Sequence, residues 1–312
     1  MNTIVVPLDG STLTEQVMPY MQTLAPLFDA KVHLLRVLED IDEELIFTGW
    51  AEVAAGMPEP LVLHTDHGHY DWDMRQQHAE GYLGTEVIRL RRASVAAEAT
   101  VASGLPADTI LDFATNEPAS LIAMATHGYS GLKRWTIGSV ADKVIQAAPC
   151  PVFLVRSTLN PNPATYSIRR ILVPLDTSAL AREALPLAMS LAQRAQAHVF
   201  LLQVVPLVRA LAMDGNAVPI ELDQERRVAA LKELTILAKE LSAHYHTPMT
   251  PLAVLGDAAG GIVCEATRWH IDLIVMSTHG YHGIRRWAMG SVADKVLHAS
   301  ATPLLLVSPV TG

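Results

Sequence analysis

The sequence predicts an α/β fold of two tandem, doubly wound domains, each built on a five-stranded parallel sheet. Three observations lead to this prediction. A domain-sized segment occurs twice within the 312 residues. Inside each copy, short apolar runs alternate with helical patterns, as in parallel sheets with helices on both faces. Half of the residues are apolar and only 18% are charged, which suits strands that are buried on both faces.

The repeat is visible near both ends of each copy. Residues 124–155 and 276–307 are identical at 19 of 32 positions, at an offset of 152. Residues 4–11 match residues 171–178 at an offset of 167, so the first copy holds about fifteen extra residues between the two anchors. A stretch rich in Pro, Asn, Ser and Thr separates the copies. We predict a first domain at 1–156 with a His-rich insert at about 39–80, a linker at 157–167, and a second domain at 168–312.

The elements of the second copy can be assigned in order along the chain. Apolar runs predict strands, and Ala and Leu at helical spacing predict the first helix. A long pattern with Glu and Lys on one face predicts the second helix, and Asp257 is placed to cap the third. We expect strands at 171–175, 198–205, 249–255, 272–276 and 304–307, and helices at 180–194, 222–244, 257–269 and 291–299.

Two segments of each copy are candidates for a binding site, because ligands of open parallel sheets bind beyond the carboxyl ends of the strands. The first follows strand one and contains Pro7 and Asp9, matched by Pro174 and Asp176. A carboxylate there can accept hydrogen bonds from ribose hydroxyls or an adenine amino group. The alternative is an Asp that only caps the next loop. If strands one and four are neighbours, this segment faces the loop that follows strand four.

That second segment contains Gly128 and Gly138, ten residues apart, with Ser139 opening the last helix. Glycine lets backbone N–H groups approach a phosphate closely, and the helix N-terminus adds unpaired N–H groups and a positive dipole end. The corresponding residues of the second copy are Gly280, Gly290 and Ser291. The alternative is that the glycines only shape turns and Ser139 is only an N-cap.

These motifs resemble the universal stress protein family, and the resemblance covers roughly residues 1–155 and 168–308. ATP-binding members of that family carry Gly, two residues, Gly, nine residues, then Gly with Ser or Thr. The later glycines match in both copies, whereas Ala125 and Ser277 replace the first one. The resemblance assigns base and ribose contacts to the two strand-one aspartates, and adenine packing to Val37 and Val204. The nucleotide-binding residues that we predict are Pro7, Asp9, Val37, Ala125, His127, Gly128, Gly138, Ser139, Val140, Pro174, Asp176, Val204, Ser277, His279, Gly280, Gly290, Ser291 and Val292.

The resemblance also implies a Rossmann-like fold of the adenine nucleotide alpha hydrolase type. Its two domains pack as a pseudo-dimer and bury the apolar edges 151–155 and 303–307, which would otherwise invite pairing. It implies ATP, accompanied by Mg²⁺, as the ligand, and a nucleotide-dependent binding module of the stress response with at most slow ATP hydrolysis. Association of two chains and a protein partner stay open. The alternatives are a scaffold that binds no nucleotide, and a nucleotidyl-transfer or ATP-hydrolysing enzyme, although the motifs of such enzymes are absent.

Other side chains have less specific interpretations. We expect His127 and His279 to shape their loops rather than to act in catalysis, and no catalytic residue is predicted. The basic residues of 133–135 and 285–287 could meet a phosphate tail or lie on a solvated loop face. No standard metal motif is present; His64, His67 and His69 are candidate ligands for Zn²⁺ or Ni²⁺. We expect Cys150 and Cys264 to be buried structural thiols.

Composition excludes several other functions. The net charge of −9 argues against non-specific nucleic-acid binding, which needs a basic surface. No apolar stretch reaches the roughly 20 residues of a membrane-spanning helix, and the N-terminus lacks a signal-peptide pattern. With two cysteines and no disulfide framework, we expect a cytoplasmic protein.

Overall fold

The computed structural model describes residues 2–39, 66–117, 119–126, 137–156, 166–207, 220–278 and 289–308, without the side chains of 66–71 and 220. The first copy contains β1 (Asn2–Pro7), η1 (Thr14–Val17), α1 (Met18–Phe28), β2 (Ala30–Leu38), α3 (Asp66–Arg92), β3 (Ala97–Ser103), α4 (Pro106–Asn116), β4 (Ala119–Ala125), α5 (Ser139–Ala147) and β5 (Val152–Val155). The second contains β6 (Arg170–Pro174), α6 (Ala179–Arg182), α7 (Leu185–Ala195), β7 (His198–Val205), α8 (Ile220–Tyr245), β8 (Met249–Leu255), α9 (Ala258–Arg268), β9 (Leu273–Ser277), α10 (Ser291–Ala299) and β10 (Leu304–Val307).

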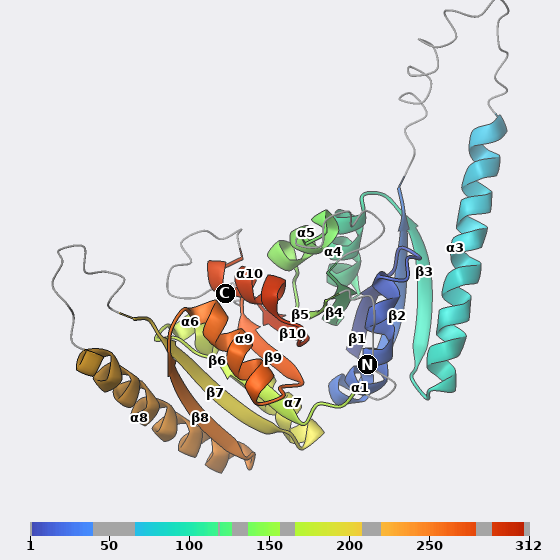
Figure 1. The fold of residues 1–312 in the computed structure, drawn as a ribbon. Coiled ribbons are helices and arrows are strands. Elements are labelled where there is room, and N and C mark those ends of the chain that lie inside the picture. Colours follow the sequence, from blue (N-terminus) through green and yellow to red (C-terminus); the bar gives the residue numbers. More distant parts are fainter. Residues whose placement is uncertain are drawn as a thin grey trace, which may run out of the picture.

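The described strands form one ten-stranded sheet in the order β3-β2-β1-β4-β5-β10-β9-β6-β7-β8 (Figure 1). Pairing is parallel within each copy, and β1 lies between β2 and β4, so strands one and four are neighbours. Among the described strands, only β5 and β10 pair antiparallel, with Leu305 opposite Phe153. This pairing joins the two domains as the predicted pseudo-dimer. As a result, neither β5 nor β10 is an unpaired edge of the sheet. The carboxyl ends of the two sets of strands therefore point in opposite directions.

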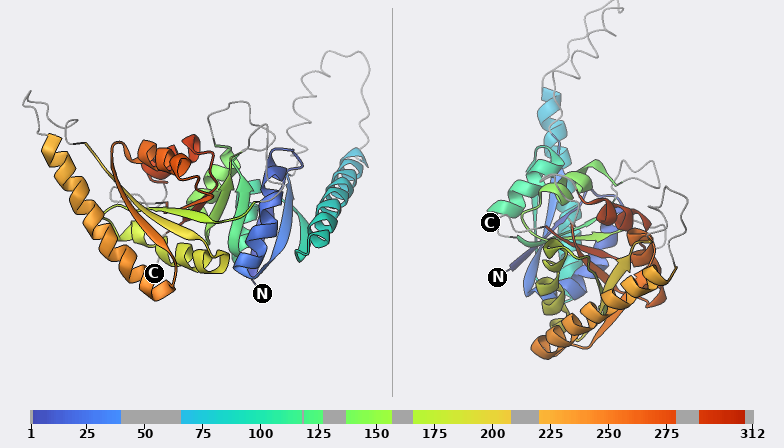
Figure 2. Two further views of the ribbon diagram at one scale, coloured as in Figure 1. Left: turned by 60° about the horizontal axis from the view of Figure 1, so that its bottom comes forward. Right: turned by 90° about the vertical axis from the view of Figure 1, so that its left-hand side faces the viewer.

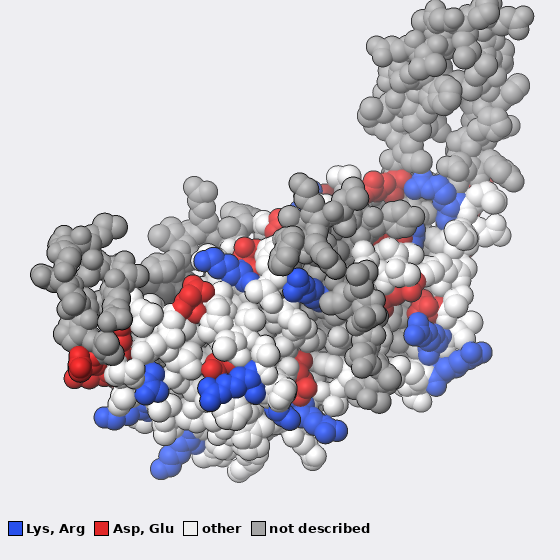
Figure 3. Space-filling model, viewed as in Figure 1, with Lys and Arg blue, Asp and Glu red and all other residues white. Residues whose placement is uncertain are grey.

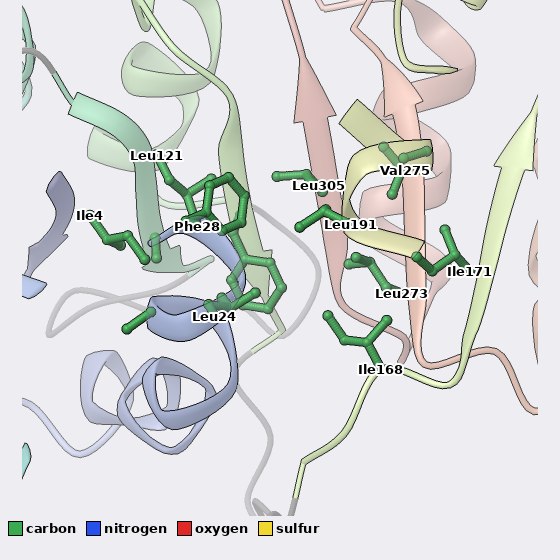
Figure 4. Close-up of a cluster of buried hydrophobic side chains, with 14 of the residues drawn as sticks. Ile4, Leu24, Phe28, Leu121, Ile168, Ile171, Leu191, Leu273, Val275 and Leu305 are labelled. Carbon is green, nitrogen blue, oxygen red and sulfur yellow. The ribbon is translucent and has the colours of Figure 1, made fainter. Parts of the chain in front are cut away.

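Helices cover both faces of the sheet, and each face carries an apolar core that runs through both copies. Residues of α1, α3, α7 and α8 pack on one face, and residues of α4, α5, α9 and α10 pack on the other. Figure 4 shows part of the first core, where Ile4 and Leu121 of one copy and Ile171 and Leu273 of the other belong to the same cluster. Figure 2 shows α3 and α8 at the two ends of the molecule.

The helix predicted at 180–194 is in fact two helices, α6 and α7. Pro186 lies at the start of α7, where its missing N–H is tolerated. In a continuous helix, its ring would clash with the carbonyl of Arg182, which is the last residue of α6. The first copy breaks in the same way, because Pro19 lies in the first turn of α1, which directly follows η1. The other helices expected in the second copy are present within one or two residues.

Several further expectations concern side chains away from the sheet centre. Asp257 caps α9 as predicted, since its Oδ2 accepts a hydrogen bond from the Gly260 N–H at 2.9 Å. Cys150 is half-buried, but the expectation for Cys264 is wrong: it lies on the solvent side of α9 and is exposed. Among the described residues, no helix has the length and apolar character needed to cross a membrane. Basic and acidic side chains are interspersed on the face that Figure 3 shows.

Candidate functional site

A cavity of about 550 Å³ opens at the carboxyl ends of β1, β2 and β4 in the first copy. Its size falls in the range of about 300–1,000 Å³ that is usual for small-molecule sites. It brings together seven of the residues predicted from sequence, namely Pro7, Asp9, Val37, Ala125, Gly138, Ser139 and Val140. Segments that are more than 100 residues apart in the chain thus form one site.

The strand-one carboxylate is held by its own loop. Asp9 Oδ1 accepts hydrogen bonds from the Ser11 N–H at 2.9 Å and from Thr14 Oγ1 at 2.7 Å. Asp176 likewise accepts bonds from the N–H and hydroxyl of Ser178. Each aspartate therefore organises the following loop, as the alternative interpretation held. In the first copy this loop also presents Asp9 and Thr14 to the cavity.

In both copies, backbone hydrogen bonds join the residue after strand four to the residue that caps the last helix. Thr126 donates its N–H to the Val155 carbonyl at 2.9 Å, and its own carbonyl accepts the Gly138 N–H at 2.9 Å. The Thr278 N–H likewise donates to the Val307 carbonyl at 3.0 Å, and the Gly290 N–H donates to the Thr278 carbonyl at 2.7 Å. These bonds fix the first turn of each last helix beside the end of strand four.

The N-terminus of α5 contributes backbone donors to the cavity. Gly138 is the N-cap, so the alternative that Ser139 is the N-cap is wrong, and the described residues provide no side-chain cap for this helix. Ser139, Val140 and Ala141 occupy its first turn and line the cavity. Because the first N–H groups of a helix have no partner within it, they form a site suited to an anion. Gly290 and Ser291 hold the same positions in α10.

Another part of the cavity wall is largely apolar and comes from β2 and α4. Val37, Leu35 and Ile110 line it, and the last two are almost completely buried. In the second copy, Val204 packs against α9, where a Cβ on Gly261 would lie only 2.8 Å from Val204 Cγ2. A flat apolar ligand group would fit beside the wall of the first copy, as a nucleotide base requires.

Sequence reasoning missed two charged residues of this cavity. Arg75 of α3 and Glu39, directly after β2, both line it. The Arg75 Nη2 donates to the Glu39 carbonyl at 3.3 Å, and its guanidinium carbon lies 5.8 Å from the centre of the Trp72 ring. Nothing in the helical pattern of α3 marks Arg75, because only the packing of α3 against β2 brings it to the cavity.

A second network of side chains lies behind the strand-one loop. The Arg36 guanidinium lies against Gly10, where an added Cβ would be 2.3 Å from Nη1. It also lies over the Tyr82 ring, 5.8 Å from its centre. The Tyr82 hydroxyl donates to Glu15 Oε1 at 2.9 Å. Burial, followed by this hydrogen bond, raises the pKa of Tyr82 above its ordinary value, so the phenol stays a donor.

The remaining predicted residues fall into two groups. Pro174, Asp176, Val204, Ser277, Gly290, Ser291 and Val292 occupy the matching strand and helix ends of the second copy. His127, Gly128, His279, Gly280 and His64 lie outside the described residues, as do the side chains of His67 and His69. Among the residues that the structure describes, no cluster of His, Cys, Asp or Glu is arranged to hold a metal ion.

The model of the universal stress protein family matches the chain twice, over residues 1–156 and 167–308. The chain belongs to the universal stress protein family. This universal stress protein is 23% identical to one from Mycobacterium tuberculosis, with 97% of this chain and 96% of that protein aligned. It is 30% identical to one from Bacillus subtilis, over 50% of this chain and 99% of that protein.

The fold is shared with a solved universal stress protein from Archaeoglobus fulgidus. The TM-score is 0.71 at 20% sequence identity, and 98% of each chain is covered. The similarity therefore extends over both copies of this chain and over nearly all of the compared chain.

Proposed function

We propose that this universal stress protein binds ATP, accompanied by Mg²⁺, and acts as a nucleotide-dependent binding module of the stress response. The observation that carries the proposal is the cavity that joins Asp9, Val37 and the first turn of α5. Helix N–H groups suit the phosphates, the carboxylate suits ribose hydroxyls, and the apolar wall suits a base. The family pattern around Gly138 supports an adenine nucleotide.

The residues present fit this ligand. Gly138, Ser139 and Val140 would hold the phosphates, and Asp9 would bind the sugar. The second copy would use Asp176, Gly290 and Ser291 in the same way. Bound ATP would supply the phosphate charge to which the protein responds. Hydrolysis of the ATP would be at most slow.

A scaffold that binds no nucleotide is the second candidate. The substitutions of the first family glycine favour it, since Ala125 is 3% exposed and Ser277 is 7% exposed at the ends of β4 and β9. A methyl or hydroxymethyl group at these strand ends reduces the room for a nucleoside.

Bound nucleotide distinguishes the two candidates. Freshly purified protein is denatured, and any released nucleotide is identified by mass spectrometry and counted per chain by absorbance. We expect between one and two ATP per chain. A value near one is assigned to a copy by comparing Gly138→Val with Gly290→Val. No released nucleotide, together with no binding of added Mg-ATP, contradicts the proposal and favours the scaffold.

A further inference from the structure

Arg75 is a cation that α3 brings to the first cavity. It lines the cavity together with Glu39 and Leu38, which lie at the end of β2. Its one hydrogen bond within the described part of the chain is the 3.3 Å contact to the Glu39 carbonyl, and no carboxylate among those residues forms an ion pair with it. A guanidinium carries five N–H donors, and among the described residues only one of them has an acceptor.

Arg226 is the counterpart of Arg75 in the second copy, and its surroundings differ. Both side chains reach from the long helix to the carbonyl that directly follows strand two, since Arg226 Nη1 donates to the Pro206 carbonyl at 2.9 Å. Arg226 also lies 3.7 Å from Asp223 Oδ1, and Asp223 is only 3% exposed. A buried carboxylate therefore holds Arg226, whereas Arg75 has no such partner among the described residues.

The two ends of the cavity suit different parts of a nucleotide. The phosphates belong at the first turn of α5, where the backbone donors lie. Asp9 directly follows Leu8 at the end of β1 (Asn2–Pro7), and β1 lies between β2 and β4 in the sheet. A nucleotide with its phosphates at α5 and its sugar at Asp9 therefore places its base beyond β1, beside Val37 of β2. Arg75 lies at this β2 side, because its Nη2 donates to the carbonyl of Glu39 directly after β2.

We propose that Arg75 is the residue by which α3 contacts the base of a nucleotide bound in the first copy, an inference that rests on the proposed function. A planar guanidinium stacks on aromatic faces and donates hydrogen bonds to acceptor atoms such as the ring nitrogens of adenine. Arg75 thereby makes base recognition in the first copy stronger than in the second, where Arg226 is engaged by Asp223.

The test uses the full chain and two probes, ATP and adenosine, titrated by calorimetry into the unmodified protein and its Arg75→Gln, Arg75→Lys and Arg226→Gln variants. Adenosine isolates the base contact because it carries no phosphate. We expect Arg75→Gln and Arg75→Lys to weaken adenosine and ATP binding by a similar factor of about ten. Arg226→Gln leaves both affinities unchanged but lowers the melting temperature, because Asp223 loses its ion-pair partner.

Each other outcome contradicts the proposal in an identifiable way. Weaker binding of ATP alone would make Arg75 a phosphate ligand, as would full rescue by Lys. If Arg75→Gln and the unmodified chain bind ATP and adenosine with equal affinity, Arg75 does not contact the nucleotide, although nucleotide binding itself stands. Binding of ATP without adenosine in the unmodified chain means that the base is not recognised here. No binding of either probe overturns the proposed function itself, and the role of Arg75 with it.

Discussion

Gly10 links the binding loop of the first copy to the network behind it. Its φ of +79° lies in a region that side chains rarely adopt. Its Cα lies against the Arg36 guanidinium, which packs over Tyr82. In the second copy, Thr177 and Gln203 stand at the positions of Gly10 and Arg36. The residues of the Arg36–Tyr82 network are therefore not repeated in the second copy, although both aspartates accept a hydrogen bond from the following Ser N–H.

We predict that Gly10→Ala lowers the free energy of unfolding by about 1–2 kcal/mol, because alanine is strained at this φ. Gly81→Ala is the matched control. Gly81 lies on an exposed face of α3, and a Cβ there meets nothing within 4 Å, so alanine should stabilise the helix by up to about 1 kcal/mol. Urea unfolding of both variants measures the two effects. Equal stability of Gly10→Ala and the unmodified chain would show that the loop relaxes freely.

At the scale of elements, the repeat offers a natural comparison between α4 and α9. Asp257 caps α9 through the Gly260 N–H. Leu105 holds the corresponding position before α4, with extended backbone, no capping hydrogen bond and 66% exposure. The two helices occupy equivalent places on the same face of the sheet, so a difference in cap strength can be measured within one molecule.

We expect Asp257→Ala to destabilise the protein by about 1 kcal/mol and Leu105→Ser to stabilise it by about 0.5–1 kcal/mol. Serine is chosen because Asp108 already places a carboxylate in the first turn of α4. Both changes are read as shifts of the urea midpoint at constant slope. If Leu105→Ser fails to stabilise the chain, its hydroxyl does not reach the first-turn N–H groups of α4.

At the scale of the whole molecule, Tyr166 joins the two copies where the second domain begins. Its ring lies 4.5 Å from that of Tyr20 in α1, and its carbonyl accepts the Thr23 hydroxyl at 2.7 Å. Its own hydroxyl donates to the Asp272 carbonyl, at the start of β9, at 2.9 Å. Together with the β5–β10 pairing, this residue makes the tandem one continuous structure.

Tyr166→Ala is expected to lower the free energy of unfolding by about 2–3 kcal/mol, since it removes a largely buried ring. It should also loosen the coupling between the copies. Differential scanning calorimetry checks this: we expect the unfolding transition to broaden or to split into two. Tyr166→Phe, the control, keeps the ring and loses one hydrogen bond, so it should cost about 1 kcal/mol and leave the shape of the transition unchanged.

Much of the fold could be predicted from sequence because it rests on local patterns. Apolar runs and helical spacing predicted the strands and helices of the second copy, and the duplicated loop motif led to residues that the structure places around one cavity. The exception was Pro186, which lies within an Ala- and Leu-rich pattern that looks continuous. Its steric effect on the preceding turn divides that pattern between α6 and α7.

By itself, the sequence determined the tandem α/β architecture, the order of its elements and seven of the cavity-lining residues. Only the tertiary structure decided that Arg75 reaches the cavity. Only it revealed that Leu305 pairs with Phe153 to make a single sheet. The reason is physical: periodicity and turn chemistry act over a few residues, whereas these contacts depend on how α3 packs on β2 and how two distant edges meet.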